Sequence, residues 1–174
     1  AGILNAVNAG IDSIEHGIFL TQECLESMLK QQTYLVPTLS AVNNIYLNRD
    51  KGIPQFIVEK TLRIRERHHE SIKMFYKAGG KIAMGTDAGT PFNLHGDNTK
   101  ELQYMADLGV SNLDVLKIST SNAADLMDLE DRGTIQKGFY ADFLIVNGDP
   151  VNDISRVSDR INHKIVVKNG VQIK

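Results

Sequence analysis

Hydrophobic positions in the first half of the chain alternate between short apolar runs and longer stretches with helical spacing. The apolar runs lie at 11–15, 34–40 and 81–85, and apolar residues recur every three or four positions in the segments between them. Alternation of this kind is typical of α/β proteins, in which short parallel strands are buried between amphipathic helices. The pattern therefore predicts three parallel strands, and it favours a barrel or a doubly wound sheet.

Capping residues place the ends of several predicted helices. Thr21 has the character of an N-cap, and Pro54 suits the first turn of a long helix that ends at Gly79. Ser111 and Asp114 have the spacing of a capping box, which predicts a further helix.

The first ten residues resemble the second half of a helix that stops at Gly10. No Ser, Thr or Asp precedes them as a cap, and no signal peptide is visible. From this opening we expect the natural polypeptide to begin upstream of Ala1.

The pattern changes toward the C-terminus, where β-rich runs replace the alternation of strand and helix. These runs occupy 133–150 and 163–174, and the Asn-Gly pair at 169–170 predicts a tight hairpin. We therefore predict two domains, an α/β part at 1–130 and a β segment at 131–174.

The amino-acid composition excludes several classes of protein but does not indicate a function. The 174 residues are 42% hydrophobic, with 19 Lys and Arg against 21 Asp and Glu and a single cysteine. These values exclude a disordered chain and a disulfide scaffold, and no basic cluster suggests nucleic-acid binding. The longest uncharged run, 31–48, is half polar and unsuited to a membrane. We expect a soluble protein in a reducing compartment, the cytoplasm.

His16 and Asp87 are the main candidates for chemistry, because each follows a short apolar run and lies close to glycine. In parallel α/β folds the residues at strand C-termini face the functional site. Imidazole and carboxylate groups bind Zn²⁺, and a carboxylate beside the metal can act as a general base. From the residues alone, a structural histidine and a turn-forming aspartate remain alternatives.

Other candidates are weaker. His68 and His69 are adjacent in a helix with charged neighbours, so we expect a solvated helix face there. His95 lies in a loop after Asp87, where it could reach a site or simply lie on the surface. Cys24 has no activating neighbour, and we expect it to be buried.

Four segments appear in the same order as in the metal-dependent amidohydrolases. They are GIDSIEHG at 10–17, KIAMGTDAGTP at 81–91, TSNAADLMDL at 120–129 and GTIQKGFYADFLIVNGDP at 133–150. The chain most resembles the imidazolonepropionase-like subgroup, which includes Xaa-Pro dipeptidase-type enzymes. The resemblance implies a (β/α)₈ TIM-type barrel, of which strands six to eight with their helices are present here, followed by a C-terminal β-sandwich segment.

The resemblance also implies roles for individual residues. His16 resembles the metal-ligand histidine at the end of strand six, and Asp87 the aspartate at the end of strand eight, which binds metal and accepts a proton from the hydrolytic water. Tyr34 and His95 lie where substrate contacts are expected. The implied activity is hydrolysis of a C–N bond in a small amide or dipeptide, with one or two Zn²⁺ ions as cofactor.

The family's remaining metal ligands have no counterpart in this sequence. These are a His-x-His pair, a bridging lysine and a further histidine, and two protein ligands fall short of a zinc site. We therefore expect a C-terminal portion of a hydrolase that is inactive as an isolated chain. The alternative is a non-catalytic module that forms homo-oligomers through exposed sheet edges.

Overall fold

The computed structural model describes residues 1–174, which form two compact units, 1–98 and 99–174. This division differs from the predicted domain boundary at 130/131. Helices between residues 100 and 126 group with the C-terminal strands because α5 packs against α6 and α8, and α6 packs against α7.

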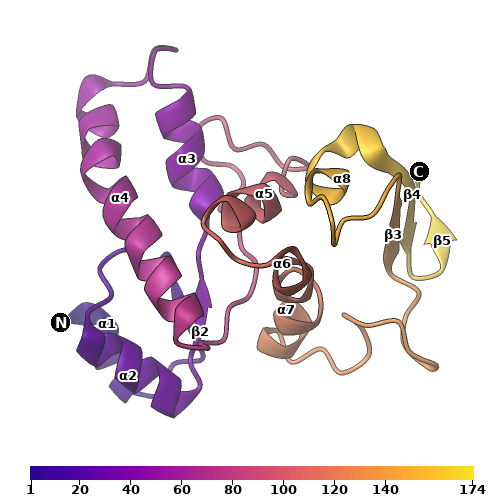
Figure 1. The fold of residues 1–174 in the computed structure, drawn as a ribbon, viewed down its shortest axis with the longest axis horizontal. Coiled ribbons are helices and arrows are strands. Elements are labelled where there is room, and N and C mark those ends of the chain that lie inside the picture. Colours follow the sequence, from indigo (N-terminus) through magenta and orange to yellow (C-terminus); the bar gives the residue numbers. More distant parts are fainter. The chain divides into compact units, whose positions relative to one another are not determined.

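The first unit alternates helices with short strands (Figure 1). Its elements are α1 (Gly2–Asn8), β1 (Ser13–Glu15), α2 (Gln22–Gln31), β2 (Tyr34–Val36), α3 (Leu39–Leu47) and α4 (Gln55–Lys77). The second unit contains α5 (Lys100–Asp107), α6 (Asn112–Ile118), α7 (Ser121–Leu126), β3 (Phe143–Val146), α8 (Ser155–Ser158), the 3₁₀-helix η1 (Arg160–Asn162), β4 (His163–Lys168) and β5 (Val171–Gln172).

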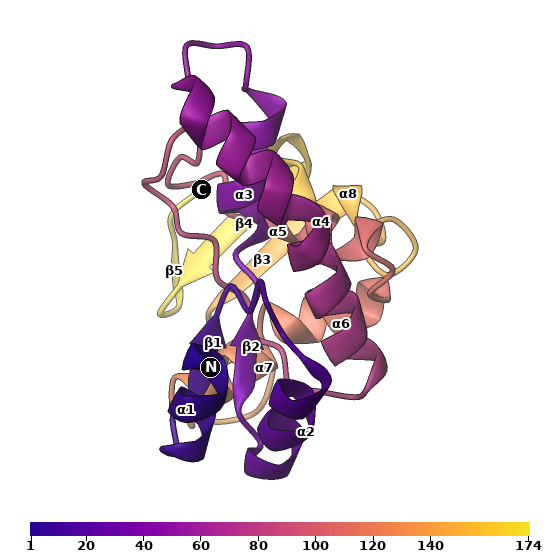
Figure 2. The ribbon, with the colours of Figure 1, turned by 90° about the vertical axis from the view of Figure 1, so that its left-hand side faces the viewer.

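Strands β1 and β2 are parallel and lie side by side (Figure 2). The predicted third strand contributes one parallel bridge, between Leu35 and Ile82. The amide of Leu35 donates to the Lys81 carbonyl at 2.9 Å, and the amide of Ala83 donates to the Leu35 carbonyl at 3.1 Å. All three segments therefore run in the same direction, as the alternating pattern predicts.

The apolar run at 34–40 predicts a strand that Pro37 either ends or moves to a constrained position, and the structure shows that it ends there. The strand ends at Val36, and helix α3 begins at Leu39. Between them, Pro37 cannot donate to the strand ladder, and Thr38 adopts the left-handed conformation with φ 51° and ψ 41°. These two residues turn the chain from the strand into a helix.

Helix α4 is the longest helix of the first unit and packs beside α3 (Figure 1). Phe75 is fully buried, and a Cβ atom at Gly80 would lie 2.3 Å from the Phe75 ring. Ser71 ties the same helix to the loop after β1, because its hydroxyl donates to the Ile18 carbonyl at 2.8 Å and accepts from the Leu20 amide at 3.3 Å. The helix thus supports the segment that follows His16.

The capping predictions at Thr21 and Ser111 are confirmed, whereas Pro54, predicted in the first turn of its helix, directly precedes α4. The Thr21 side chain accepts from the amide of Cys24 at 3.2 Å, and Cys24 is buried as expected. Ser111 accepts from the amide of Asp114, also at 3.2 Å. Both helices begin one residue after their caps, so local sequence determines where they start.

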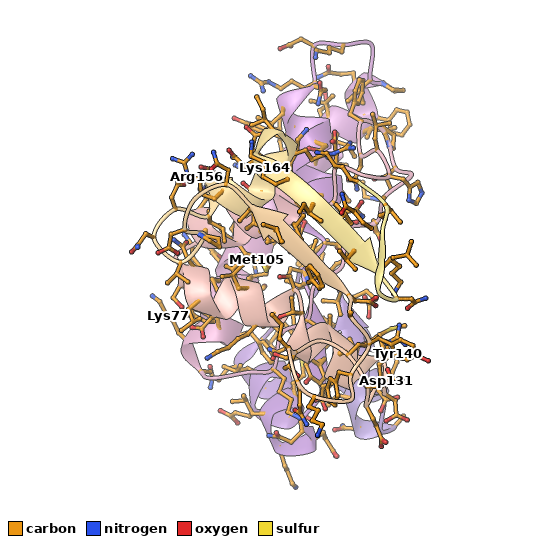
Figure 3. All side chains as sticks on the ribbon, turned by 90° about the vertical axis from the view of Figure 1, so that its right-hand side faces the viewer. Lys77, Met105, Asp131, Tyr140, Arg156 and Lys164 are labelled. Carbon is orange, nitrogen blue, oxygen red and sulfur yellow. The ribbon has the colours of Figure 1, made fainter.

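The second unit contains an antiparallel sheet with the order β3-β4-β5 (Figure 3). The predicted hairpin lies between β4 and β5, where Asn169 and Gly170 have φ values of 51° and 77°. Asp142 supports this turn by accepting from the Asn169 amide at 2.6 Å, and its carboxylate also pairs with Lys168. Across both units, no helix combines the length and apolar character that crossing a membrane requires.

Candidate active site

Three residues at the ends of the parallel segments share an unusual backbone conformation. His16 directly follows β1, Thr38 lies two residues after β2, and Asp87 follows the segment that contains Ile82. Their φ values are 64°, 51° and 52°. Left-handed φ is uncommon outside glycine and costs on the order of 1–3 kcal/mol per residue, and such residues cluster at functional sites.

The structure brings the side chains of His16 and Asp87 together. Nε2 of His16 lies 3.6 Å from Oδ2 of Asp87, and the two side chains are 43% and 44% exposed. The parallel segments are paired in register, so their C-terminal ends lie next to one another. His16 and Asp87, which follow two of these ends, can therefore face each other although 71 positions separate them in the sequence. Half-exposed groups of this kind are open to a ligand from solvent.

The other ring nitrogen of His16, Nδ1, forms a hydrogen bond with the hydroxyl of Thr38. That hydroxyl donates to the Pro37 carbonyl at 2.7 Å. His68, from helix α4, reaches the same carbonyl with its Nε2 at 2.9 Å. The row of hydrogen bonds therefore connects His16 with the interior of the first unit.

His68 lies fully buried, so the prediction that it belongs to a solvated helix face is wrong. Its Nδ1 atom has no hydrogen-bond partner. Burial, which disfavours the charged ring, lowers the pKa of His68 to about 4, although the Pro37 carbonyl partly opposes this effect. His68 is thus neutral at neutral pH. A periodic signal was present, because His68 lies four residues after Ile64 and four before Ile72, on the apolar face of the helix.

His69 lies between buried and exposed, which also departs from the predicted solvated face. Burial lowers its pKa to about 4, with the positive charge of Arg65 as the next contribution. Its ring centroid lies 6.5 Å from that of His68, and the two planes are tilted by 38°. No hydrogen bond joins His69 to the row that leads to His16.

Asn93, which the sequence did not single out, organises the loop after Asp87. Its side chain donates to the Thr86 carbonyl at 2.5 Å and to the Thr90 hydroxyl at 3.2 Å, and its own carbonyl accepts from the Gly89 amide at 2.7 Å. Thr90 in turn donates to the main-chain oxygen of Asp87. The available signal was an asparagine between Gly89 and Gly96, a composition typical of a turn-forming loop.

The two predicted substrate contacts lie in different places. His95 belongs to the Asp87 loop, where its Nε2 lies 3.6 Å from the position of a Cβ atom built on Gly89. Tyr34 is buried at the opposite end of β2 from Thr38, and the Lys81 ammonium lies 5.2 Å from the centroid of its ring. The structure does not bring Tyr34 to His16 and Asp87.

The spacing of the His16 and Asp87 donor atoms fits two ligands of one metal ion. Two ligands at about 2.0–2.1 Å from a tetrahedral Zn²⁺ lie about 3.4 Å from each other, close to the 3.6 Å between Nε2 and Oδ2. No group of three or more His, Cys, Asp or Glu side chains in the chain could hold a metal. His16 and Asp87 by themselves would not complete a zinc site, which takes three or four protein ligands.

Comparison with known proteins gives consistent matches over almost the whole chain. The ochratoxinase of Aspergillus niger is 27% identical over 157 residues, which cover 88% of this chain and 32% of that protein. The crystal structure of A. niger ochratoxinase matches with a TM-score of 0.84 and 28% identity, over 100% of this chain and 39% of that one. The chain thus spans well under half of these relatives.

Dipeptidase structures match equally well. A Xaa-Pro dipeptidase with methionine bound in its active site is 34% identical, with a TM-score of 0.88, over 99% of this chain and 42% of that one. A prolidase complexed with N-methylphosphonate-L-proline is 27% identical, with a TM-score of 0.90. The model of the Amidohydrolase family matches residues 1–173. These matches confirm the resemblance to dipeptidase-like amidohydrolases, and the chain belongs to the amidohydrolase family.

Proposed function

We propose that this chain carries part of the active site of a metal-dependent amidohydrolase that hydrolyses a C–N bond in a small amide or dipeptide. His16 and Asp87 are two of its metal ligands. The observation that carries the proposal is the 3.6 Å separation of Nε2 and Oδ2, two donor atoms on the ends of neighbouring parallel segments. The remaining ligands come from outside these 174 residues.

The proposed fold follows from the same arrangement. Strands β1 and β2 and the segment at 81–83 are three consecutive strands of a (β/α)₈ barrel, and β3 to β5 belong to a β-sandwich. Ligands at the carboxyl ends of barrel strands then lie at the face where such barrels hold their active sites.

His16 and Asp87 would hold a divalent metal, for which Zn²⁺ is a suitable ion, and the bound metal would supply Lewis-acid activation of water and of the scissile carbonyl. Asp87 accepts a proton from the attacking water and delivers it to the leaving nitrogen. The hydrogen bonds from Thr90 reach the main-chain oxygen of Asp87 and leave its carboxylate for these tasks. His16 holds its ring in one orientation through Nδ1.

The substrate class rests on the relatives. A Xaa-Pro dipeptidase and a prolidase are among them, and the dipeptidase holds methionine in its active site. We therefore propose a dipeptide-like substrate, with His95 as a contact because it lies in the loop that carries Asp87. Nothing in the geometry favours the alternative of a non-catalytic oligomeric module, and sedimentation across micromolar concentrations would test the predicted oligomer.

A zinc titration followed by nitrogen-15 NMR of the imidazole rings tests the two ligands in the chain itself. Zinc should shift Nε2 of His16 before any other ring nitrogen, with an affinity weaker than that of a complete site. Asp87→Asn should weaken this binding at least about tenfold, because it removes the charged donor. Asp97→Asn, in the same loop region, is the matched control and should leave binding unchanged.

Activity gives the second test. The isolated chain should release no proline from Xaa-Pro dipeptides with zinc present. A longer protein that contains it should do so, and His16→Gln or Asp87→Asn should lower kcat/KM there by about a thousandfold or more. Zinc shifts at His95 or His163 without any at His16, or full activity in the Asp87→Asn protein, would contradict the proposal.

A further inference from the structure

A row of hydrogen bonds lies behind the ring of His16, on the side away from Asp87. We propose that Thr38, supported by His68, selects the tautomer in which Nδ1 of His16 carries the hydrogen and Nε2 presents its lone pair to Asp87. Thr38 and His68 are then positioning residues, since they act on the ligand and not on substrate. The inference rests on the proposed function for its purpose, but the tautomer can be measured without any metal.

The direction of each hydrogen bond follows from donor chemistry. A carbonyl oxygen can only accept, so the 2.9 Å contact between His68 Nε2 and the Pro37 carbonyl places the hydrogen of His68 on Nε2. The Thr38 hydroxyl donates its single hydrogen to the same carbonyl at 2.7 Å. Toward His16 it therefore offers only a lone pair, and Nδ1 of His16 must donate.

The Pro37 carbonyl is the fixed point of this arrangement. It has two lone pairs, and the hydrogens of Thr38 and His68 occupy both. His68 thereby holds the carbonyl that keeps the hydroxyl hydrogen of Thr38 directed away from His16. Without His68 the carbonyl would lose a buried donor, and the hydroxyl would be less strictly oriented.

The burial of Thr38 and His68 strengthens their effect on the tautomer of His16. Thr38 is 2% exposed and His68 fully buried, so bulk water does not compete for the hydroxyl. A Cβ atom at Gly85 would lie 2.4 Å from Val36 Cγ1 and 3.4 Å from Thr38 Cγ2. The next parallel segment therefore packs closely against the Thr38 methyl group, which fixes the direction of its hydroxyl.

The selected tautomer agrees with the 3.6 Å between Nε2 of His16 and Oδ2 of Asp87, which is too long for a hydrogen bond. In neutral His16 the lone pair of Nε2 points toward Oδ2, so that two acceptors meet without a hydrogen between them. This arrangement suits a shared cation, and metal-binding histidines characteristically donate their other ring N–H to a second group. The opposite tautomer would place the hydrogen on Nε2 and leave that atom without a lone pair for a metal.

Nitrogen-15 spectra of the labelled chain, recorded without metal at pH about 8.5, test the proposal. At this pH an ordinary imidazole with a pKa of about 6.5 is neutral, and its protonated and unprotonated nitrogens resonate at well-separated frequencies. His16→Gln identifies the signals by their loss. The expected result is an unprotonated Nε2 and a protonated Nδ1 at His16.

Thr38→Ala and Thr38→Ser form a matched pair that differs by one hydroxyl oxygen. The ratio of the Nδ1–H to the Nε2–H tautomer should fall about tenfold in the alanine variant, the effect of losing one hydrogen bond. The serine variant should keep the wild-type ratio. His68→Gln, which retains a donor, should change the ratio less than His68→Leu does.

Two outcomes would overturn the proposal. One is a protonated Nε2 with an unprotonated Nδ1 at His16 in the wild-type chain, a result that decides the matter even if the alanine variant does not fold. The other is the same ratio in the alanine, serine and wild-type chains. A chain that shows the expected tautomer but binds no zinc would retain this inference and reject the proposed function.

Discussion

Strands β2 and β3 are both short and rich in branched apolar residues, but their burial is opposite. Every residue of β2 is buried, whereas no residue of β3 is. β2 pairs with β1 and also with the segment at Ile82, whereas β3 belongs to a small antiparallel sheet of the kind that can leave one face open. The candidate ligands follow the two segments that pair with the buried strand β2, and a site needs rigid support of this kind from the elements that carry it.

Two isoleucines test this contrast with the same substitution. Ile82 is 2% exposed and Ile145 is 45% exposed. Ile82→Ala should lower the free energy of unfolding by about 3–4 kcal/mol, because it leaves a cavity, and Ile145→Ala by about 1 kcal/mol or less. Urea unfolding of both variants measures the difference.

Equal losses of unfolding free energy in Ile82→Ala and Ile145→Ala would contradict the proposed difference between the two strands. If the loss of unfolding free energy in Ile145→Ala grows with protein concentration, the exposed sheet is covered by another copy of the chain in solution. A third variant, Ile145→Val, separates lost volume from lost strand propensity.

A pH titration of stability tests the buried side of the contrast. Burial lowers the pKa of His68 from 6.5 to about 4, so folding favours its neutral form. The stabilisation is complete above pH about 6.5 and is lost as the pH falls through about 4, by about 3 kcal/mol. His68→Gln should therefore flatten the decline of the free energy of unfolding between these values.

His69→Gln is the control for this experiment, because burial lowers the pKa of His69 as well. His69 lies only partly buried, so solvent screening should leave it the smaller share of the decline. If the decline persists unchanged in both variants, these histidines are not its cause.

The two helix caps test whether local structure differs between the units. Thr21 and Ser111 each accept a main-chain N–H at 3.2 Å. Thr21→Ala and Ser111→Ala should each cost about 1 kcal/mol, because the chemistry is the same in both places. Thermal melts compare them, with Thr21→Ser and Ser111→Thr as conservative controls. A much larger loss at Thr21 would mean that burial amplifies a local contact.

The smallest effect should come from the turn between β4 and β5. The Asn169 amide and the Lys168 ammonium hold the pKa of Asp142 below its ordinary value. The stabilisation is therefore present above the ordinary carboxyl range and is lost as the pH falls through the lowered value. Asp142→Asn should lower the melting temperature slightly at low salt and less at high salt. A loss as large as that of Ile82→Ala would contradict this ranking.

Local signals predicted much of the fold. Caps placed the helix starts at Thr21 and Ser111, and the Asn-Gly pair placed the hairpin at 169–170, because each depends on neighbours in the sequence. Helix α3 was not predicted, because its start depends on the left-handed conformation of Thr38. A threonine in the sequence gives no indication of that conformation. The juxtaposition of strand ends was predictable from the parallel pattern alone.

The support of the site could not be predicted in the same way. His68 lies on the apolar face of its helix, but the carbonyl that accepts its hydrogen is 31 positions away in the sequence. Such a partner is defined only once the chain has folded. The sequence pattern identifies residues that bear chemistry far more readily than residues that orient them.

The left-handed backbone at His16, Thr38 and Asp87 has a consequence for engineering. Glycine would relieve strain at each position, and a screen for thermal tolerance alone would tend to select it there. Each such gain would remove the imidazole, the hydroxyl or the carboxylate that these three residues place close together. At these three positions, thermal stability and the proposed chemistry therefore favour different residues. Directed evolution of this chain for stability should keep the three residues unchanged and vary the others.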